Sequence, residues 1–362
     1  MPMIQEVLEL HTWPKPQGRF SGYQYTLMHS GQVIESGYGG RLSASAEAAS
    51  VTPDSVFDLA SVTKLYTATL ASILHDAGQV DLDAPIGDWV AVGADLSQTT
   101  SRELLTHVSG LPPWWEEQST RASTISKLYE LAPSPQQRGE LVYSCTGYSM
   151  YAMSVEQKYG TTFDQILRAR LLDPLGLEET VFNPSGERYE IVTAKEPKED
   201  VPPGKVHDPR ARALDGISGN AGLFANSSQV ARFLNALAGG DSAVITAGVR
   251  RQLFTPSASS EWEQAIGFRF QDVGRLGSAS HFFSHSGFTG TLAMTNPETS
   301  VSGVLLTNRL QCDTTREQMA EVYVSFAEWV GRHDGFLSLS EDRSPAMRVE
   351  HGEISLPAGL WC

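Results

Sequence analysis

Strand-like stretches lie near both ends of the 362-residue chain, and a mainly helical block separates them. Near the N-terminus, two alternating stretches flank Gly31 and predict a β-hairpin: residues 23–28 and 33–36. After residue 262, short apolar runs separated by turns predict consecutive antiparallel strands at 265–270, 281–284, 291–295 and 301–307. We expect the two sets to pair in one sheet, which makes the helical block an insertion.

The expected fold class is therefore α/β (α+β), an antiparallel sheet flanked by helices with an inserted, mainly helical domain. The length exceeds that of a usual single core. We expect a sheet domain of residues 1–78 and 230–362 and an inserted domain of residues 79–229, with the active site at their junction. Apolar periodicity predicts helices at 61–77, 101–105, 123–131, 147–159, 162–171, 228–237 and 315–330.

Charge and composition exclude several classes of partner. The formal net charge of -15 argues against nucleic acid and against anionic membrane surfaces. No apolar run approaches ~20 residues, so no membrane span is expected. The first residues lack a basic stretch followed by an apolar one, and the three cysteines form no C-x-x-C pair. We therefore expect free thiols and a cytoplasmic protein without cofactor.

A Ser-x-x-Lys pair stands at the start of the helix expected at 61–77. Residues three apart share one helix face, so Lys64 can reach the hydroxyl of Ser61. A helix N-terminus also favours developing negative charge. A serine nucleophile needs a base within reach and a site that stabilises an oxyanion. The pair therefore marks Ser61 as a candidate nucleophile.

Three further patterns accompany this pair. Tyr143 lies in Val-Tyr-Ser-Cys-Thr-Gly at 142–147, on a turn before a helix. His285-Ser286-Gly287 lies between two predicted strands, and Leu-Leu-Thr-His-Val-Ser-Gly-Leu-Pro at 104–112 follows a predicted helix. Each pattern alone is weak evidence for a catalytic site. Their occurrence together, in this order and at these separations, is much stronger evidence.

With these motifs, roughly residues 20–330 resemble the serine β-lactamase and penicillin-binding protein superfamily, in its class C β-lactamase-like branch. That branch includes D,D-carboxypeptidases, family VIII esterases and acyltransferases. The resemblance implies that Ser61 is the nucleophile, that Lys64 shares its proton, and that Tyr143 is the general base or a relay to the leaving group. It places the oxyanion hole at the N–H groups of Ser61 and Phe288.

Two positions depart from the pattern of the branch. Cys145 stands where Asn is usual, and a thiol is a weak hydrogen-bonding group, although a small buried hydrophobic role is the plain alternative. His285 replaces the usual Lys of the third motif, and an ordinary histidine gives a weaker charge that depends on pH. Both changes favour esters or amides less anionic than β-lactams. The expected substrate-binding residues are Cys145, His285, Ser286, Gly287 and Trp114.

Several other polar or aromatic residues have plain interpretations. His107 is expected to be structural, and Trp114 with Trp115 is expected either to rim a cleft or to pack as a loop. His207-Asp208 has no partners at metal-ligand spacing, so no metal is expected. The small-residue loop 216–222 is expected to be a structural turn, although its backbone could approach the site.

The sequence therefore predicts a serine hydrolase that forms an acyl-enzyme with a small-molecule ester, amide or acyl substrate. A cytoplasmic acyltransferase that uses the same acyl-serine is the alternative. β-Lactamase or D,D-carboxypeptidase activity, and a non-catalytic binder, are the further alternatives. The sequence leaves open the physiological substrate and the oligomeric state.

Overall fold

A computed structural model describes residues 3–116, 119–194, 201–239, 242–260, 262–270 and 282–334. The predicted strand start at 281, the tail at 335–362 and Cys362 lie outside these residues. Within them, no helix has the length and apolar character needed to cross a bilayer.

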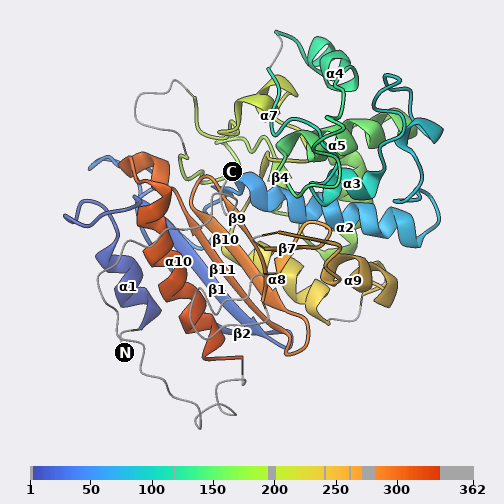
Figure 1. The fold of residues 1–362 in the computed structure, drawn as a ribbon. Coiled ribbons are helices and arrows are strands. Elements are labelled where there is room, and N and C mark those ends of the chain that lie inside the picture. Colours follow the sequence, from blue (N-terminus) through green and yellow to red (C-terminus); the bar gives the residue numbers. More distant parts are fainter. Residues whose placement is uncertain are drawn as a thin grey trace.

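One large antiparallel sheet organises the molecule (Figure 1). Its eight described strands have the spatial order β2-β1-β11-β10-β9-β8-β7-β6. Their bounds are β1 Gly22–His29, β2 Gln32–Gly40, β6 Ala258–Ser259, β7 Glu263–Gln264, β8 Arg269–Phe270, β9 Phe283–Gly287, β10 Thr291–Asn296 and β11 Val301–Thr307. A smaller sheet has the order β3-β5-β4, with β3 Phe57–Asp58, β4 Val181–Phe182 and β5 Leu223–Ala225.

The predicted pairing of N-terminal and C-terminal strands is confirmed. β1 pairs with β11 in an antiparallel register that runs from Tyr23 opposite Thr307 to His29 opposite Val301. The predicted hairpin is also confirmed, because β1 pairs with β2 through a turn at Ser30 and Gly31. Both turn residues have positive φ, which matches a two-residue hairpin turn. The division into domains at residues 78 and 229 stays a prediction.

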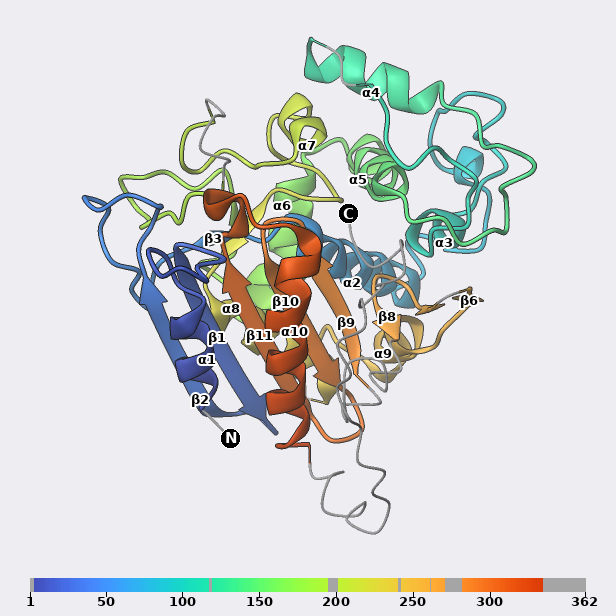
Figure 2. The ribbon, with the colours of Figure 1, turned by 60° about the vertical axis from the view of Figure 1, so that its left-hand side comes forward.

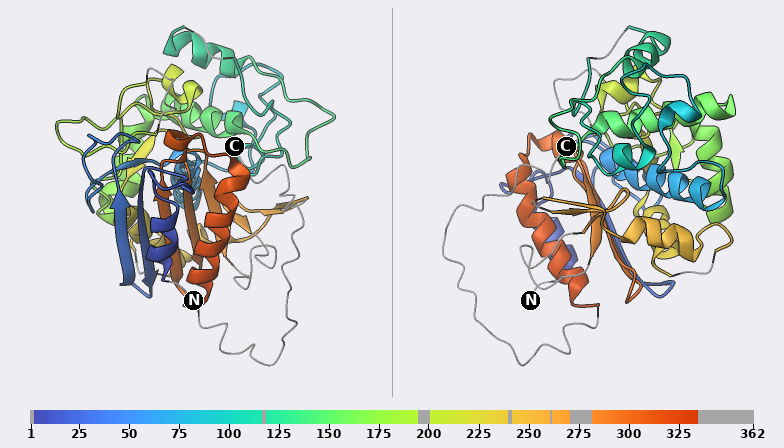
Figure 3. Two further views of the ribbon diagram at one scale, coloured as in Figure 1. Left: turned by 90° about the vertical axis from the view of Figure 1, so that its left-hand side faces the viewer. Right: turned by 45° about the vertical axis from the view of Figure 1, so that its right-hand side comes forward.

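Helices cover both faces of the large sheet (Figures 2 and 3). α1 (Ile4–Leu10) and α10 (Arg316–Gly331) pack together on one face and share an apolar cluster with β1 and β11. α8 (Ser227–Ala238) packs on β1, β10 and β11 from the other face. α2 (Thr63–Asp76) packs against α9 (Ala247–Phe254) on that same side. Residues on both faces of the central strands are therefore buried.

The middle of the chain is mainly helical, as predicted. It contains α3 (Ser101–Leu105), α4 (Arg121–Tyr129), α5 (Cys145–Tyr159), α6 (Phe163–Leu167) and α7 (Pro209–Ala213), and a π-helical turn at Arg168–Leu172 follows α6. Either Asn226 or Ser227 is expected from the sequence to cap α8, and in the structure Asn226 accepts a hydrogen bond from the N–H of Gln229. α1 and α9 were not predicted, because each is too short for its apolar periodicity to stand out in the sequence.

Asn308 joins segments that lie far apart in the sequence. Its Oδ1 accepts hydrogen bonds from the N–H groups of Ser21 and Gly22, each at 3.0 Å. Its Nδ2 donates to Ser21 Oγ at 2.7 Å and to the carbonyl of Thr193 at 3.1 Å. The side chain is buried. One amide thus ties the start of β1 to the end of β11 and to the middle of the chain.

Asn308→Ala is expected to lower the free energy of unfolding by about 2–4 kcal/mol, because it leaves buried backbone N–H groups without an acceptor. Urea denaturation of the full chain measures this change. Asn235→Ala is the matched control, since Asn235 Oδ1 accepts a bond from the N–H of Gly31 at an exposed position. A loss at Asn308 no larger than the loss at Asn235 would contradict the prediction.

Candidate active site

Ser61 lies on a short connection between β3 and α2. Asp58 ends β3, and a 3₁₀ turn at Ala60–Val62 leads directly into α2. Ser61 was predicted at the start of the helix, and the structure places it on this 3₁₀ turn, two residues before α2 begins at Thr63. Ala60 has a φ of 45°, which is unusual for a residue with a side chain. The nucleophile candidate is therefore held in a turn that stores strain.

Hydrogen bonds from three segments hold this turn. The Thr289 hydroxyl donates to the carbonyl of Asp58 at 2.7 Å, and the Thr291 hydroxyl donates to the carbonyl of Leu59 at 3.1 Å. The Asp58 carboxylate accepts from the N–H of Ala60 at 2.8 Å and from the N–H of His207 at 2.7 Å. The third motif and the 201–208 segment are thus fixed to the residues that precede Ser61.

Lys64 reaches Ser61 as the helical spacing predicted. Its Nζ donates to Ser61 Oγ at 2.9 Å, and it also donates to the carbonyl of Asn220 at 3.1 Å and to Cys145 Sγ at 3.4 Å. Lys64 is fully buried. The loop 216–222 therefore approaches the site with a backbone carbonyl, which is the role that the sequence left open beside a plain turn.

Tyr143 and Cys145 enter the site from the start of α5. Ser144 is the N-cap, and its hydroxyl accepts a bond from the N–H of Gly147, so Cys145 is the first residue of the helix. The ring centroid of Tyr143 lies 5.0 Å from Lys64 Nζ. Cys145 is buried, but its contact with Lys64 gives it a polar role beyond that of a small hydrophobic residue.

The rings of His107 and His285 both lie close to the Tyr143 ring. The ring centroids are 4.5 Å apart for His107 and 6.0 Å apart for His285. His107 Nδ1 accepts a bond from the N–H of Ser144 at 3.1 Å, in agreement with the structural role expected from the sequence. His285 Nδ1 donates to the carbonyl of Ser286 at 2.7 Å.

Both histidines are uncharged near neutral pH. Burial lowers the pKa of His107 and of His285 well below the usual 6.5, and the charges of Arg269 and Lys64 lower both further. The sequence suggested that His285 gives a charge that varies near neutrality, and this interpretation is wrong. The burial of the strand end, which no local pattern reveals, is the physical reason.

A cavity of about 180 Å³ opens at Ser61. Of the residues marked in the sequence, Ser61, Cys145, Trp114 and Phe288 line it. Trp114 is 55% exposed at the cavity, whereas Trp115 is 4% exposed, so the first rims the site and the second packs. In the third motif, Gly287 is buried and Ser286 is partly buried on β9. The residue that follows the motif, Phe288, lines the cavity.

Sequence reasoning missed four residues near this site. Arg269 on β8 lies with its guanidinium carbon 4.6 Å from the centroid of Tyr143. Arg210 and Arg316 line the cavity, where they stack over Trp114 at 5.9 Å and over Phe288 at 5.0 Å. Asn220 lies in the loop 216–222, whose backbone approach the sequence left open, but the sequence did not indicate which carbonyl bonds Lys64. A charged residue within the apolar stretch Phe268-Arg269-Phe270 was the one available signal.

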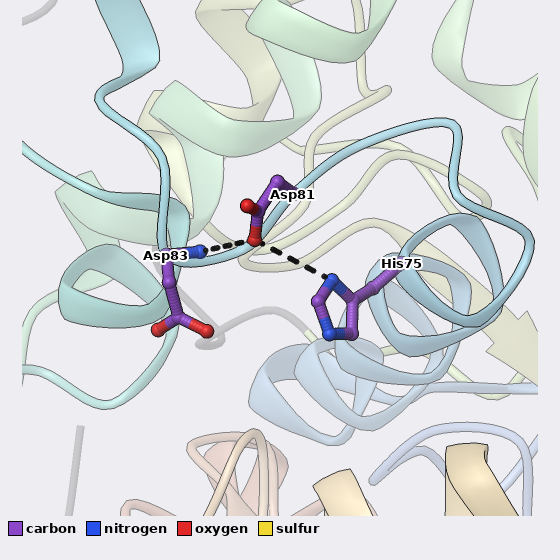
Figure 4. A group of neighbouring side chains, drawn as sticks. All are labelled: His75, Asp81 and Asp83. Carbon is purple, nitrogen blue, oxygen red and sulfur yellow. Dashed lines mark hydrogen bonds and ion pairs between the residues drawn. The ribbon is translucent and has the colours of Figure 1, made fainter.

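His75, Asp81 and Asp83 form a second polar group, shown in Figure 4. His75 is near the C-terminal end of α2, about 20 Å along the helix from Ser61. Arg102 already pairs with the Asp83 carboxylate at 2.6 and 2.9 Å, and the N–H of Leu82 donates to His75 Nδ1 at 3.3 Å. These bonds satisfy the group without an ion, so it is best described as an ion-pair cluster.

The lowered pKa of His285 gives a pH dependence of stability with a definite sign. The unfolded chain binds a proton at His285 near pH 6.5, whereas the folded chain does so only at lower pH. The free energy of unfolding should therefore fall as pH is lowered from 6.5 to 5, by up to ~1.4 kcal/mol per pH unit for this residue. His285→Gln should remove that part of the slope in urea titrations, and His29→Gln, at an exposed position, is the control. An unchanged slope in His285→Gln would contradict the prediction.

Comparisons with known proteins agree with this architecture. A family model described as beta-lactamase matches residues 3–328. A putative D-alanyl-D-alanine carboxypeptidase of Escherichia coli (strain K12) is 26% identical over 71% of this chain and 70% of its own length. An N-acetylmuramyl-L-alanine amidase of Bacillus subtilis (strain 168) is 26% identical over 70% of this chain and 68% of its own.

Solved structures share the fold at low sequence identity. EstCE1, described as a hydrolase with promiscuous acyltransferase activity, has a TM-score of 0.74 at 20% identity and covers 90% of this chain and 97% of its own. A class C beta lactamase from Rhodobacter sphaeroides has a TM-score of 0.72 at 19% identity, with coverage of 91% and 97%. The match over nearly all described residues identifies the chain as a member of the beta-lactamase family.

Proposed function

We propose that the protein is a serine hydrolase that forms an acyl-enzyme with a carboxylic ester or amide. One observation carries this proposal: Lys64 Nζ lies 2.9 Å from Ser61 Oγ, and Ser61 lines a cavity large enough for a small acyl group. A serine hydroxyl next to a buried base or cation is the arrangement that nucleophilic catalysis requires.

The proposed roles combine the contacts of the site with those that the family resemblance implies. Ser61 Oγ attacks the carbonyl carbon, its proton passes to the network of Lys64 and Tyr143, and the carbonyl oxygen becomes an oxyanion. The N–H groups of Ser61 and Phe288, both residues of the cavity wall, are proposed to stabilise it. The leaving group receives the proton, and water then attacks the acyl-enzyme by the same path. The hydroxyls of Thr289 and Thr291 bond the carbonyls of Asp58 and Leu59, and so tie the segment after β9 to the residues that precede Ser61.

The charges and aromatic side chains of the cavity wall indicate which classes of substrate could bind. His285 is neutral and buried, so it gives no fixed charge to a substrate carboxylate. Arg210 and Arg316 lie on the cavity wall instead, beside the aromatic faces of Trp114 and Phe288. We propose that an acid group on a substrate would meet these arginines, and that uncharged esters bind through the aromatic faces. Peptidase or β-lactamase activity is thus a side reaction of the same acyl-serine.

A cytoplasmic acyltransferase is the second candidate. EstCE1, which shares the fold, is described as both hydrolase and acyltransferase, and both reactions pass through an acyl-enzyme. The two differ only in the acceptor, since an alcohol or amine takes the place of water. A labelled acyl donor with added alcohols or amines separates them: transferred label supports the second candidate, and label released only to water supports hydrolysis for the acceptors used.

A fluorophosphonate should add covalently to Ser61, with the mass of one adduct in the intact protein. Ser61→Ala should abolish the adduct and lower kcat/KM for an activated ester by at least ~10³. Ser72→Ala is the matched control, because Ser72 is a buried serine on α2 whose hydroxyl donates to the carbonyl of Ala68 at 2.9 Å. An adduct that persists in Ser61→Ala would refute the assignment of the nucleophile.

The proposed oxyanion site depends on close contact between β9 and the Ser61 turn. A Cβ at Gly287 would lie 2.2 Å from Thr291 Oγ1 and 2.6 Å from the carbonyl of Leu59. Gly287→Ala should therefore displace Phe288 and lower kcat by about 10²–10³, the usual effect of losing one oxyanion donor. Gly186→Ala is the control, since a Cβ there meets nothing within 4 Å. Equal activity of the two variants would argue against the role of Phe288.

A further inference from the structure

Phe288 lies on the turn between β9 and β10, against the connection that carries Ser61. Just before it, a Cβ at Gly287 would come within 2.6 Å of a carbonyl oxygen of that connection. Just after it, the Thr289 hydroxyl donates to the carbonyl of Asp58 at 2.7 Å. Phe288 and Ser61 also line the same cavity. The main chain at Phe288, whose N–H is one of the two proposed oxyanion donors, is therefore next to the nucleophile candidate.

Arg309 bonds this turn from the segment that follows β11. Its Nε donates to the carbonyl of Phe288 at 2.7 Å, and its main-chain N–H donates to the carbonyl of Thr289 at 3.0 Å. Its guanidinium carbon also lies 4.5 Å from the centroid of the Phe288 ring. The carbonyl of Gly287 accepts from the N–H of Gly290 at 3.0 Å. Both planar peptide groups that flank Phe288 are thus held, which fixes the direction of its N–H.

Arg309 is itself held in place. It is 6% exposed, and its guanidinium also donates to the carbonyl of Thr314. The residue before it, Asn308, is the buried amide that joins the start of β1 to the end of β11. An arginine keeps its charge at every relevant pH, and its rigid fork of donors can hold two acceptors at once. A permanent cation therefore supports the Phe288 peptide, whereas His285 of the third motif carries no charge.

We propose that Arg309 is a positioning residue for the oxyanion site, because it holds the Phe288 peptide. This inference rests on the proposed function. Phe288 and Arg316 line the cavity, whereas Arg309 is not among its lining residues in the described part of the chain, so Arg309 acts on a bound substrate through Phe288. As Ser61 Oγ bonds to the carbonyl carbon, the carbonyl π pair moves to oxygen, and a donor must lie about 3 Å from that oxygen. A small displacement of the donor therefore slows the reaction.

Steady-state kinetics with an uncharged activated ester give the first readout. In Arg309→Met, kcat should fall about 10- to 100-fold while KM stays within about twofold, because an oxyanion donor acts on the transition state. Arg250→Met is the matched control, since Arg250 Nε also donates to a main-chain carbonyl, that of Leu237 on α8 at 3.2 Å. A fall in kcat no larger than that of Arg250→Met, or a change in KM alone, would overturn the role of Arg309.

Phenylboronic acid probes the oxyanion site without turnover. Ser61 Oγ loses its proton and gives an electron pair to boron, and one oxygen of the resulting tetrahedral anion takes the place of the oxyanion. In Arg309→Met, the Kd for phenylboronic acid should rise by about the factor by which kcat/KM falls. Ser61→Ala should abolish formation of this adduct. An unchanged Kd in Arg309→Met would contradict the proposal, because a general loss of structure is not expected to spare this adduct.

The double variant of Arg309→Met and Gly287→Ala tests whether Arg309 acts through Phe288. Both changes displace the same N–H, so kcat of the double variant should lie within about twofold of kcat of Gly287→Ala. Losses that multiply would overturn the proposal. If Arg309→Met does not fold, Arg309→Lys carries the test, because lysine keeps the charge but loses the fork. Its kcat should fall about 3- to 10-fold at constant KM, and an unchanged kcat would overturn the role.

Fluorophosphonate labelling separates this inference from the proposed function. An adduct on Ser61, together with unchanged kcat in Arg309→Met, would overturn the role of Arg309 alone. Absence of an adduct in the unaltered chain would refute the proposed function and, with it, this role.

Discussion

The antiparallel pairing of β1 with β11 is the constraint on which the rest depends. It joins residues 22–29 to residues 301–307, so the chain must leave the sheet after β2 and return to it before β11. The chain after β2 passes through β3 and the Ser61 turn, and the chain before β11 passes through β9 and β10. Closing the sheet therefore brings the nucleophile candidate and the third motif to neighbouring positions without any direct sequence signal between them.

Buried polar contacts then convert this proximity into a defined geometry. Two threonine hydroxyls hold the carbonyls of Asp58 and Leu59, and the Asp58 carboxylate holds the N–H of Ala60. Such groups are costly to bury unless they are paired, so their mutual satisfaction fixes one arrangement of the turn. The strained φ of Ala60 persists because these bonds determine it from several sides.

Local patterns predicted the elements that depend on local physics. The hairpin at Gly31, the helix of Lys64, the helix α8 and the last three strands follow from turn residues and periodicity, and the structure confirms them. The relation of Ser61 to Lys64 spans a 3₁₀ turn and the first residues of α2, and it was equally accessible from their spacing in the sequence. Tyr143 and the third motif were found by their resemblance to a family, since no spacing rule links them to Ser61.

What escaped prediction is non-local. Arg269 reaches Tyr143 only because β8 pairs with β9, and the charge state of His285 depends on what the fold packs around it. The carbonyl of Asn220 has no side-chain signature at all. The candidate reacting groups could therefore be identified from motifs. Their protonation states and the contacts that support them could not, because these depend on residues that come close only in the folded structure.

The arginines of the cavity lie in a molecule whose formal net charge is -15. An anionic ligand would approach against the field of the whole surface and be attracted only within the last ~8–10 Å, the range that physiological salt leaves unscreened. Added salt weakens the distant repulsion more than the contact attraction. Association of acidic ligands would consequently become faster with ionic strength, and capture of uncharged ligands would not change.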